Sequence, residues 1–432
     1  MASTYLTRTN GTPTDLKIQT YSVWVKRSGL SSSTYRLFGG YDGSSGYSGE
    51  INFSSNQFRM EFGGSSLFEI KTNAVYRDTS AWYHLVVSID TTQATASDRV
   101  KLYVNGEQIT SLASSNYPSQ NATSLIGISG RTFVVGGGWS GAEPFDGSMA
   151  HVHFIDGTAY DASYFGQADA NGVWTIKTSP SVTYGNNGFF ILKDGNSVTD
   201  QSGNGNNFTV ASGTLTNTED NPSNVFCTLN PLISIGNDAG NQQVLSNGNL
   251  HVTGNQPSWC HSRGTFGASS GKWYWEVKVN GSTMGYLNIG VSNAGTNMYG
   301  GTVQSLSGNT SIYGDGQYNI NGTITGAQSP TFSAGDICGV ALNMDSNTVS
   351  FYKNGTILSW GTNLSISGGT DDVWLPASAV YNTSQSLDFN FGNGYFGTTA
   401  VSSAGTNASG IGIFEYDVPT GYTALSTKGL NL

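Results

Sequence analysis

The stretch Trp82-Tyr-His-Leu-Val-Val-Ser-Ile-Asp90 is followed along the chain by Arg99-Val-Lys-Leu-Tyr-Val104 and then by Asn105-Gly106. In both stretches apolar residues recur at every second position, which is typical of a β-strand with one face in a core. The Asn-Gly pair favours a type I′ turn, because both central residues of that turn need positive φ. This region therefore predicts antiparallel strands with a β-hairpin at residues 105–106.

The same alternation recurs along the rest of the chain at intervals of about 8–12 residues, which predicts antiparallel β-sandwiches rather than a βα architecture. A second Asn-Gly hairpin is expected at Asn354-Gly355. Gly335-Asp-Ile-Cys-Gly-Val-Ala-Leu-Asn-Met-Asp345 is apolar at consecutive positions, so we expect a central strand there. The other expected strands include Tyr21-Ser-Val-Trp-Val-Lys26, Lys272-Trp-Tyr-Trp-Glu-Val-Lys-Val279, Val349-Ser-Phe-Tyr-Lys353 and Leu387-Asp-Phe-Asn-Phe-Gly392.

Composition agrees with an all-β fold. Only 11% of the 432 residues are charged, whereas 12% are aromatic and 58 are Gly. The surfaces of helical proteins and coiled coils need many charged residues, and disordered chains are poor in aromatic residues. An all-helical protein, a coiled coil and a disordered chain are therefore excluded. The net charge of −10 and the absence of a basic cluster argue against nucleic-acid binding.

A change of composition at residues 181–222 predicts the domain organisation. This segment is crowded with Gly, Asn, Asp, Ser and Thr and contains Asp220-Asn-Pro-Ser223, which breaks regular structure. We therefore predict a β-sandwich over residues 1–180, a connector over 181–222 and a second β-sandwich over 223–395. A C-terminal extension, residues 396–432, is expected to pack on the second domain.

Targeting and redox signals are few. The N-terminal segment has no apolar run of about 7–15 residues, so we expect no signal peptide, and no stretch is long and apolar enough for a membrane span. Cys227, Cys260 and Cys338 do not form a disulfide framework. We expect synthesis in a reducing cytoplasm.

Catalytic carboxylates and metal ligands do not form a complete set. Retaining glycosidase chemistry needs two carboxyl groups close together, whereas Glu50-Ile-Asn-Phe-Ser54 provides one acid, with Asn52 and Ser54 at the next two positions of the same strand face. His151 and His153 share a strand face but lack further zinc ligands in a recognisable spacing. No enzyme activity and no cofactor are expected, although calcium is conceivable at Asp42 or Asp200, where oxygen-bearing side chains lie in Gly-rich loops.

Aromatic residues among Gly, Asn, Asp and Ser are the most informative candidates for binding. Sugars bind on aromatic faces with amide and hydroxyl groups at the rim, so these residues predict a ligand-binding role; subunit contacts are the alternative, since Tyr and Trp are enriched at interfaces. The candidate ligand-binding residues are Tyr299, Tyr313, Tyr318, Tyr41 and Trp139.

Two family resemblances follow from particular stretches. The first half, about residues 1–180, resembles the laminin-G/concanavalin-A-like jelly roll. The residues that carry this resemblance are Tyr21-Ser-Val-Trp-Val-Lys-Arg27, Trp82–Asp90 with Lys101-Leu-Tyr-Val-Asn-Gly-Glu107, and Phe145-Asp-Gly-Ser-Met-Ala-His-Val152. The second half resembles a SPRY (B30.2-type) sandwich over about 223–395. The residues that carry it are Gly271-Lys-Trp-Tyr-Trp-Glu-Val277, Ile289-Gly-Val-Ser292, Gly335–Asp345 and Val349-Ser-Phe-Tyr-Lys-Asn-Gly355.

The combination, in this order, is similar to a group of bacteriophage virion proteins, often tail-fibre-like. Two further stretches match that group. One is Asp156-Gly-Thr-Ala-Tyr-Asp-Ala-Ser-Tyr-Phe-Gly166 followed by Gly172-Val-Trp174, and the other is Val418-Pro-Thr-Gly-Tyr-Thr-Ala-Leu-Ser-Thr-Lys-Gly-Leu-Asn-Leu432. This resemblance implies a non-enzymatic virion surface protein, either a tail fibre or a head decoration or knob, which contacts other virion structural proteins and takes part in adsorption to host-surface glycan.

The resemblance also implies a homo-oligomer, with a trimer as the expected state, or a monomer that becomes oligomeric on the particle. Its expected location is the virion surface, after synthesis in the host cytoplasm, without membrane insertion. Two functions of other classes remain as alternatives: a polysaccharide-degrading enzyme of concanavalin-A-like fold, and an intracellular SPRY adaptor that binds a peptide.

Overall fold

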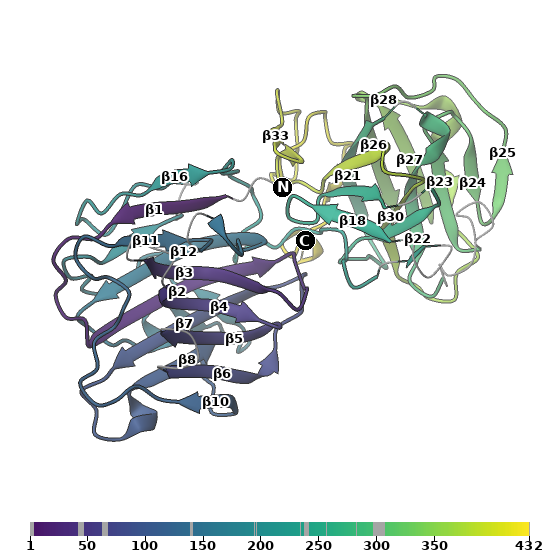
Figure 1. Cartoon of the computed structure of the whole chain (residues 1–432). Helices are drawn as coiled ribbons and strands as arrows, with labels where there is room; N and C mark the ends of the chain where they lie inside the picture. Colours follow the sequence, from purple (N-terminus) through teal and green to yellow (C-terminus); the bar gives the residue numbers. More distant parts are fainter. Residues whose placement is uncertain are drawn as a thin grey trace. The chain divides into compact units, whose positions relative to one another are not determined.

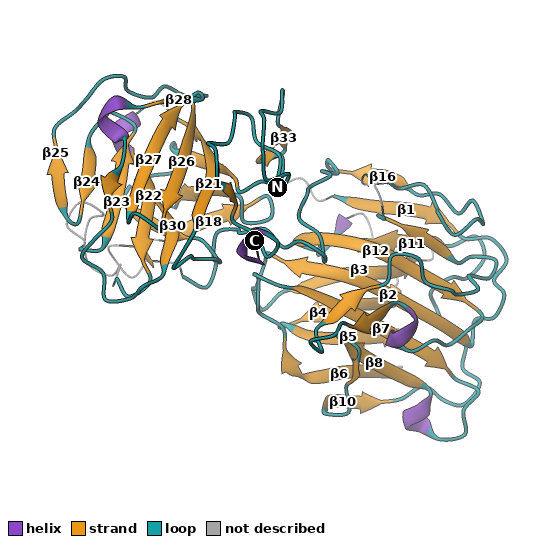
Figure 2. Cartoon of the chain, turned by 180° about the vertical axis from the view of Figure 1, so that it is seen from behind, coloured by secondary structure: helices purple, strands orange, loops and turns teal. Residues whose placement is uncertain are grey.

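The computed structural model describes residues 4–431 apart from 42–46, 63–67, 139–140, 194, 196, 234, 237–241, 256, 282 and 297–306, and apart from the side chains of 47–48 and 235–236. The chain divides into two compact units, Met1–Asn217 and Thr218–Leu432. Both are built from β-strands, and the helical segments of the described residues are 3-10 turns of three residues. Figure 1 shows the strands and Figure 2 the same chain from behind, coloured by secondary structure.

The first unit is a sandwich of two antiparallel sheets. The larger sheet has the order β10-β6-β5-β4-β3-β11-β1-β16 and the smaller one β15-β12-β2-β7-β8-β9. The strands of the larger sheet are β1 (Tyr5–Thr9), β3 (Thr34–Tyr41), β4 (Tyr47–Ser54), β5 (Gln57–Phe62), β6 (Phe68–Val75), β10 (Leu112–Asn116), β11 (Thr132–Val135) and β16 (Thr209–Ser212). Those of the smaller sheet are β2 (Ile18–Arg27), β7 (Trp82–Asp90), β8 (Val100–Val104), β9 (Glu107–Gln108), β12 (Gly147–Asp156) and β15 (Phe189–Ile191).

The alternating residues that predicted these strands fill the space between the sheets. Leu85, Val87 and Ile89 of β7 are buried in the same core as Phe133 of β11. The hairpin at Asn105-Gly106 is confirmed: Val104 pairs with Glu107, and the two turn residues have φ of 49° and 87°. These φ values belong to the left-handed region that Asn and Gly tolerate best.

Outside the two large sheets, a short segment covers the outer face of the smaller sheet. This segment contains the 3-10 turn Ala162–Tyr164 and the hairpin of β13 (Gly166–Ala168) and β14 (Trp174–Ile176). A separate 3-10 turn, Ala96–Asp98, lies elsewhere in the unit and precedes β8. Ala162 and Phe165 pack on Val86 and Ile155 of the sheet. Both faces of the smaller sheet are therefore buried over this area.

The prediction of a connector at residues 181–222 is wrong for most of that segment. β15 (Phe189–Ile191) pairs with β12, Phe208 is buried in the core, and β16 pairs with β1. The unit boundary lies after Asn217. The Gly- and Asn-rich composition has a different cause, because these residues form tight turns within the first sandwich; Asp200, for example, accepts hydrogen bonds from the backbone N–H of Ser202 and Asn206.

The second unit is also a sandwich of two main sheets, ordered β17-β20-β30-β22-β23-β24-β25 and β18-β19-β31-β21-β26-β27-β28. The first contains β17 (Ile235–Gly236), β20 (Cys260–Arg263), β22 (Leu287–Asn293), β23 (Asn309–Tyr313), β24 (Tyr318–Ile320), β25 (Thr323–Thr325) and β30 (Trp374–Val380). The second contains β18 (Gln243–Ser246), β19 (His251–Gly254), β21 (Lys272–Asn280), β26 (Ile337–Asn343), β27 (Thr348–Lys353), β28 (Thr356–Ile357) and β31 (Ser386–Asn390).

Its shorter elements complete the list: β29 (Leu364–Ser365), β32 (Tyr395–Phe396), β33 (Thr399–Ala400), β34 (Thr423–Ala424) and the 3-10 turns Met284–Tyr286, Ser359–Gly361 and Gly429–Asn431. Trp275, Val277 and Val340 lie in the core between the sheets. The second predicted hairpin is confirmed too, since Lys353 pairs with Thr356 across Asn354-Gly355.

The C-terminal residues pack within the second unit. β34 runs parallel to the start of β21, and Phe414, Val418 and Ala424 cover Tyr274 on the outer face of that strand. Glu276, also on this face, accepts hydrogen bonds from the backbone N–H groups of residues 415 and 416. The C-terminal segment is therefore fixed by backbone pairing, apolar packing and a buried carboxylate.

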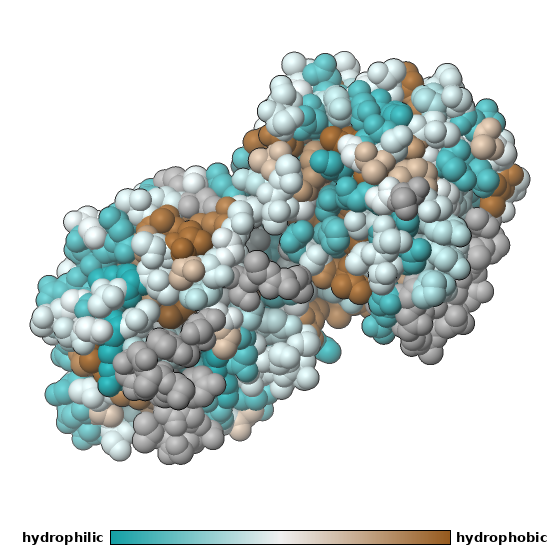
Figure 3. All heavy atoms as spheres, turned by 45° about the horizontal axis from the view of Figure 1, so that its top comes forward, coloured by the Kyte–Doolittle hydropathy of each residue, from teal (hydrophilic) through white to brown (hydrophobic). Residues whose placement is uncertain are grey.

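Polar residues cover most of the face that Figure 3 shows, with apolar residues in small groups. Large apolar side chains with substantial exposure, such as Val75, Val173, Leu232 and Ile324, come from separate elements. Within the described ranges, no helix has the length and apolar character required to cross a membrane.

Candidate functional site

Four aromatic residues of the second unit meet at one end of the seven-stranded sheet. Strand register explains this convergence: Val380 pairs with Cys260 on one side and with Leu287 on the other, and Asn288 pairs with Tyr313. The residues next to these positions are therefore brought together from four segments. We call the set the aromatic cluster; it consists of Trp259, Tyr286, Tyr313 and Tyr381.

The geometry of the aromatic cluster is that of a rigid support below one exposed ring. Tyr286 and Tyr381 stack with centroids 4.5 Å apart, and the ring of Trp259 meets Tyr381 edge-on at 5.7 Å. Trp259 also meets Tyr313 edge-on at 6.2 Å. Tyr313 is 1% exposed, whereas Tyr286 is 39% exposed. The buried rings thus fix the ring that faces solvent.

Polar groups lie beside the aromatic cluster. The Asp315 carboxylate is so close to Gly285 that a Cβ at that position would lie 2.8 Å from Oδ2. Asn382, which follows Tyr381, uses its side-chain oxygen to accept hydrogen bonds from Ser384. An exposed ring can bind a sugar whose C–H groups pack on it, and carboxylate or amide oxygens on adjoining residues can accept hydrogen bonds from the sugar hydroxyls.

The first unit carries a second polar arrangement on the outer face of its larger sheet. Glu50 of β4 is in register with Glu61 of β5, which is in register with Glu69 of β6. Arg36 pairs with Glu50 at 2.7 Å, and Arg59 pairs with Glu61 at 2.8 Å and with Glu69 at 3.3 Å. A search for acids along one strand cannot find this row, because it crosses three strands and depends on their register.

Each of the three carboxylates in this row is bound by an arginine, so no two of them are well suited to act as a catalytic pair. Glu50 is only 1% exposed and also accepts a hydrogen bond from Asn52. Burial raises the pKa of Glu61, while Arg59 lowers it and the other two glutamates raise it. A retaining glycosidase needs a nucleophile and an acid that can both reach the substrate. The buried ion pair of Glu50 instead favours a structural role.

The predicted ligand-binding residues lie in different environments or fall outside the described residues. Tyr41 and Tyr313 were expected in exposed loops, and this is wrong: both are buried, in β3 and β23. Gly39 is a strand residue that leaves room for the Tyr41 ring, since a Cβ there would lie 2.5 Å from it. Tyr318 is half-buried and stacks on Trp360 at 6.2 Å. The predictions for Tyr299 and Trp139 fall outside the described residues.

His153 and Asp200, two of the residues considered for metal binding, are engaged in other contacts. His153 makes a hydrogen bond of 3.0 Å to the Tyr184 hydroxyl and stacks on Phe190, and burial lowers its pKa. The Asp200 carboxylate accepts hydrogen bonds within its own turn, and Asp42 lies outside the described residues. In the part of the chain that the structure describes, no three His, Cys, Asp or Glu side chains are grouped to hold a metal ion.

Comparison with known families agrees with the two units. The family model of the concanavalin A-like lectin/glucanase superfamily (Laminin_G_3) matches residues 2–163, and the SPRY domain model matches residues 272–394. The chain thus combines a concanavalin A-like domain with a SPRY domain, and the predicted all-β, jelly-roll fold class is confirmed. These domain types support a binding or structural role.

Solved structures give remote similarities. The SPRY domain of human HERC1 is 17% identical, with 34% of this chain and 91% of that chain covered and a TM-score of 0.29. The TRIM65 PSpry domain is 16% identical over 38% and 91%, with a TM-score of 0.29. The heptameric SAP-like pentraxin of Limulus polyphemus is 16% identical over 37% and 71%, also with a TM-score of 0.29. A comparison with curated proteins gives no match.

Proposed function

We propose that this protein is a non-enzymatic bacteriophage virion surface protein that attaches to glycan on the host cell. The observation that carries the binding part of the proposal is the aromatic cluster, in which the exposed Tyr286 ring stacks on Tyr381 and the Asp315 carboxylate lies close to the neighbouring Gly285. A preformed support lowers the ordering cost of binding, because the ring is already fixed before the sugar arrives.

Two segments that match the phage virion group support the virion part. Gly172-Val-Trp174 and Val418–Leu432 lie outside both regions matched by the family models. Each is nevertheless integral to its unit: Trp174 donates a hydrogen bond to Nδ1 of His84 at 3.0 Å, and Ala424 is fully buried against Tyr274. These segments therefore act as parts of the sandwiches and not as loose appendages.

Low charge favours neutral ligands at the aromatic cluster. With 11% charged residues in the chain, binding would depend on packing and hydrogen bonds, so it should change little with salt. Single lectin-type sites of this kind are weak, and many copies on one particle strengthen attachment through avidity. Homotrimers on the virion, in contact with other virion structural proteins, would supply those copies.

A glycan-binding assay with purified protein tests the proposal. We expect wild-type protein to bind surface polysaccharide extracted from the host, and Tyr286→Ala to lower that affinity about tenfold, because the exposed ring supplies the packing surface. Tyr164→Ala is the matched control, since Tyr164 is exposed to a similar extent, 42%, but lies in the first unit. Equal binding by wild-type protein and Tyr286→Ala would remove the aromatic cluster from the proposal.

The same preparations distinguish binding from degradation. If the row of Glu50, Glu61 and Glu69 were catalytic, wild-type protein would release reducing sugar from the polysaccharide. We expect no release, because the arginine partners keep these carboxylates engaged. Release that stops in Glu61→Gln would establish the enzyme alternative in place of the binding role.

A further inference from the structure

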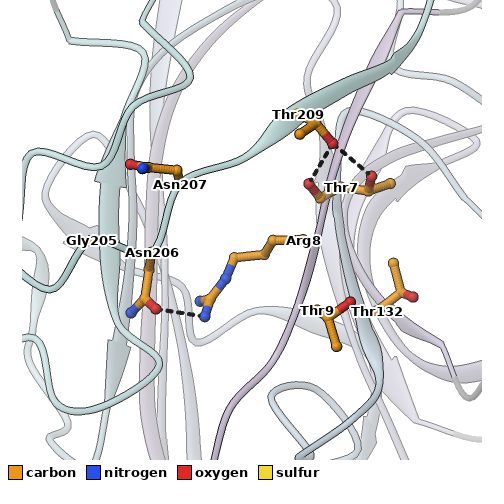
Figure 4. A pocket seen from close by; sticks show the side chains of 8 residues that line it. All are labelled: Thr7, Arg8, Thr9, Thr132, Gly205, Asn206, Asn207 and Thr209. Atoms are coloured by element: carbon orange, nitrogen blue, oxygen red, sulfur yellow. Dashed lines mark hydrogen bonds between the residues drawn. The ribbon is translucent and has the colours of Figure 1, made fainter.

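A polar pocket opens in the first unit where two strands separate. β16 pairs with β1 from Tyr5 to Thr7, and the pairing between these two strands stops before Arg8. The space beyond is lined by residues 7–9 of β1, Thr132 of β11 and the segment from Gly205 to Thr209. Figure 4 shows the Arg8 side chain extending from β1 across this space toward Asn206, with the Thr7–Thr209 contact at one end.

Arg8 has hydrogen-bonding capacity left in this pocket. Its Nη1 donates to the Asn187 carbonyl at 2.8 Å, and its Nη2 donates to Oδ1 of Asn206 at 2.6 Å. A guanidinium has five N–H donors. Two are bonded to these described residues, so the guanidinium has further N–H groups that a ligand in the pocket could engage. The two bonds also fix the plane of the group, which prepares it for a planar partner.

The charge of Arg8 is only partly balanced by the protein. Arg8 is the one ionisable side chain among the residues that line the pocket. The charges of Asp200 and Asp156 favour the guanidinium, but their carboxylates already accept backbone N–H groups, for example from Phe190 and Asn187. Burial lowers the pKa of Arg8 more than these two acids raise it. An anion in the pocket would stabilise the guanidinium.

The neutral walls decide what kind of anion fits. Thr7, Thr9, Thr132 and Thr209 offer hydroxyls and Asn207 an amide, and no second cation lines the pocket. A polyanion such as a phosphate would meet one guanidinium in a chain of net charge −10. A sugar with a single carboxylate matches better, because its hydroxyls can pair with the threonines while its carboxylate pairs with Arg8.

We propose that this pocket binds the carboxylate of an acidic sugar, such as a uronic acid unit of a surface polysaccharide. The proposal rests on the glycan-binding role given above, but it concerns the other unit and other side chains. The aromatic cluster would take neutral sugar by packing, and the Arg8 pocket would take acidic sugar by charge-assisted hydrogen bonds. The chain would then recognise two features of one polysaccharide.

The test uses full-length protein and two sugars of the same shape, D-glucuronate and D-glucose, with binding followed by NMR titration. We expect glucuronate to bind about tenfold more tightly than glucose, and this preference to shrink as salt rises, since screening weakens the charge contact. Arg8→Gln should abolish the preference. Arg77→Gln, which changes an exposed arginine of the same unit, should leave it intact.

A second variant guards against misfolding of Arg8→Gln. Thr132→Val removes one hydroxyl of the pocket while keeping the shape of a strand residue, and it should weaken glucuronate binding about threefold. Acetate is a further probe: it should compete only weakly, and equal competition by acetate would overturn the assignment to a sugar. Equal affinity for glucuronate and glucose, or a preference unchanged in Arg8→Gln, would overturn the proposal itself.

Failure of this inference can be told apart from failure of the proposed function. Tyr286→Ala should retain glucuronate binding, because Tyr286 lies in the second unit. Loss of polysaccharide binding in Tyr286→Ala with an intact glucuronate preference would support both sites. Polysaccharide binding by wild-type protein without any glucuronate preference would overturn the Arg8 site alone.

Discussion

Glu276→Gln should change how the stability of the second unit depends on pH. Glu276 is fully buried on β21, and its carboxylate accepts backbone N–H groups of Tyr416 at 2.9 Å and of Glu415 at 2.8 Å. Tyr274 and Asn390 donate to it at longer distances. Burial raises its pKa from 4.5 to about 7, because desolvation outweighs these four donors, each of which favours the charged form.

The sign of the effect follows from the direction of that shift. An acid whose pKa is raised in the folded state binds its proton more tightly when folded than when unfolded. Its contribution to stability is therefore complete below pH 4.5 and is lost as the pH rises through about 7. The difference between 4.5 and about 7, at about 1.4 kcal/mol for each pH unit, corresponds to roughly 3 kcal/mol.

Urea unfolding of the full chain at pH 4.5 and at pH 8 measures this loss in the transition of the second unit. Gln imitates the protonated acid at every pH, so Glu276→Gln should lack this part of the pH dependence. All other groups are the same in both proteins, so the difference between the two pH dependences isolates Glu276. Glu219→Gln, at an exposed carboxylate, should behave as wild type. An identical pH dependence in wild type and Glu276→Gln would refute the reasoning.

Three further predictions concern the units and their assembly. Limited proteolysis should cut first near Asn217 and give two resistant fragments, because β15 and β16 tie the preceding residues to the first sandwich; initial cleavage within residues 186–208 would contradict this boundary. Phe133→Ala should destabilise the transition of the first unit by about 3–5 kcal/mol and leave that of the second unchanged, because Phe133 is fully buried among Tyr21, Phe154 and Phe189; a calorimetric scan measures both. Light scattering should show a homotrimer, and a monomer both in solution and on the particle would exclude it.

Local signals in the sequence were sufficient for the sandwiches. Alternation placed Leu85, Val87 and Ile89 in the core, and both Asn-Gly pairs form the expected hairpin turns. These features depend on residues close together in the chain, where steric preferences decide the conformation. The prediction of a connector was wrong because a Gly- and Asn-rich composition fits both a linker and a set of tight turns.

Most of the site depends on contacts between distant residues. The aromatic cluster joins Trp259, Tyr286, Tyr313 and Tyr381, which meet only because their strands pair in a particular register. The Gly-rich sequence around Tyr41 favoured an exposed position for its ring. In the structure, Gly39 instead leaves room for the buried Tyr41 ring. The types of residue that flank an aromatic residue in the sequence therefore indicate how freely the backbone can turn. They do not indicate on which side of a sheet the aromatic ring lies.

The most direct test of the proposed function is the adsorption rate of virions that carry this protein on host cells. Particles with Tyr286→Ala, at a copy number matched to wild type, should adsorb several-fold more slowly, while particles with Tyr164→Ala should adsorb at the wild-type rate. Absence of the protein from purified virions, or equal adsorption by all three, would contradict its role as a virion surface protein that attaches to host glycan through the aromatic cluster.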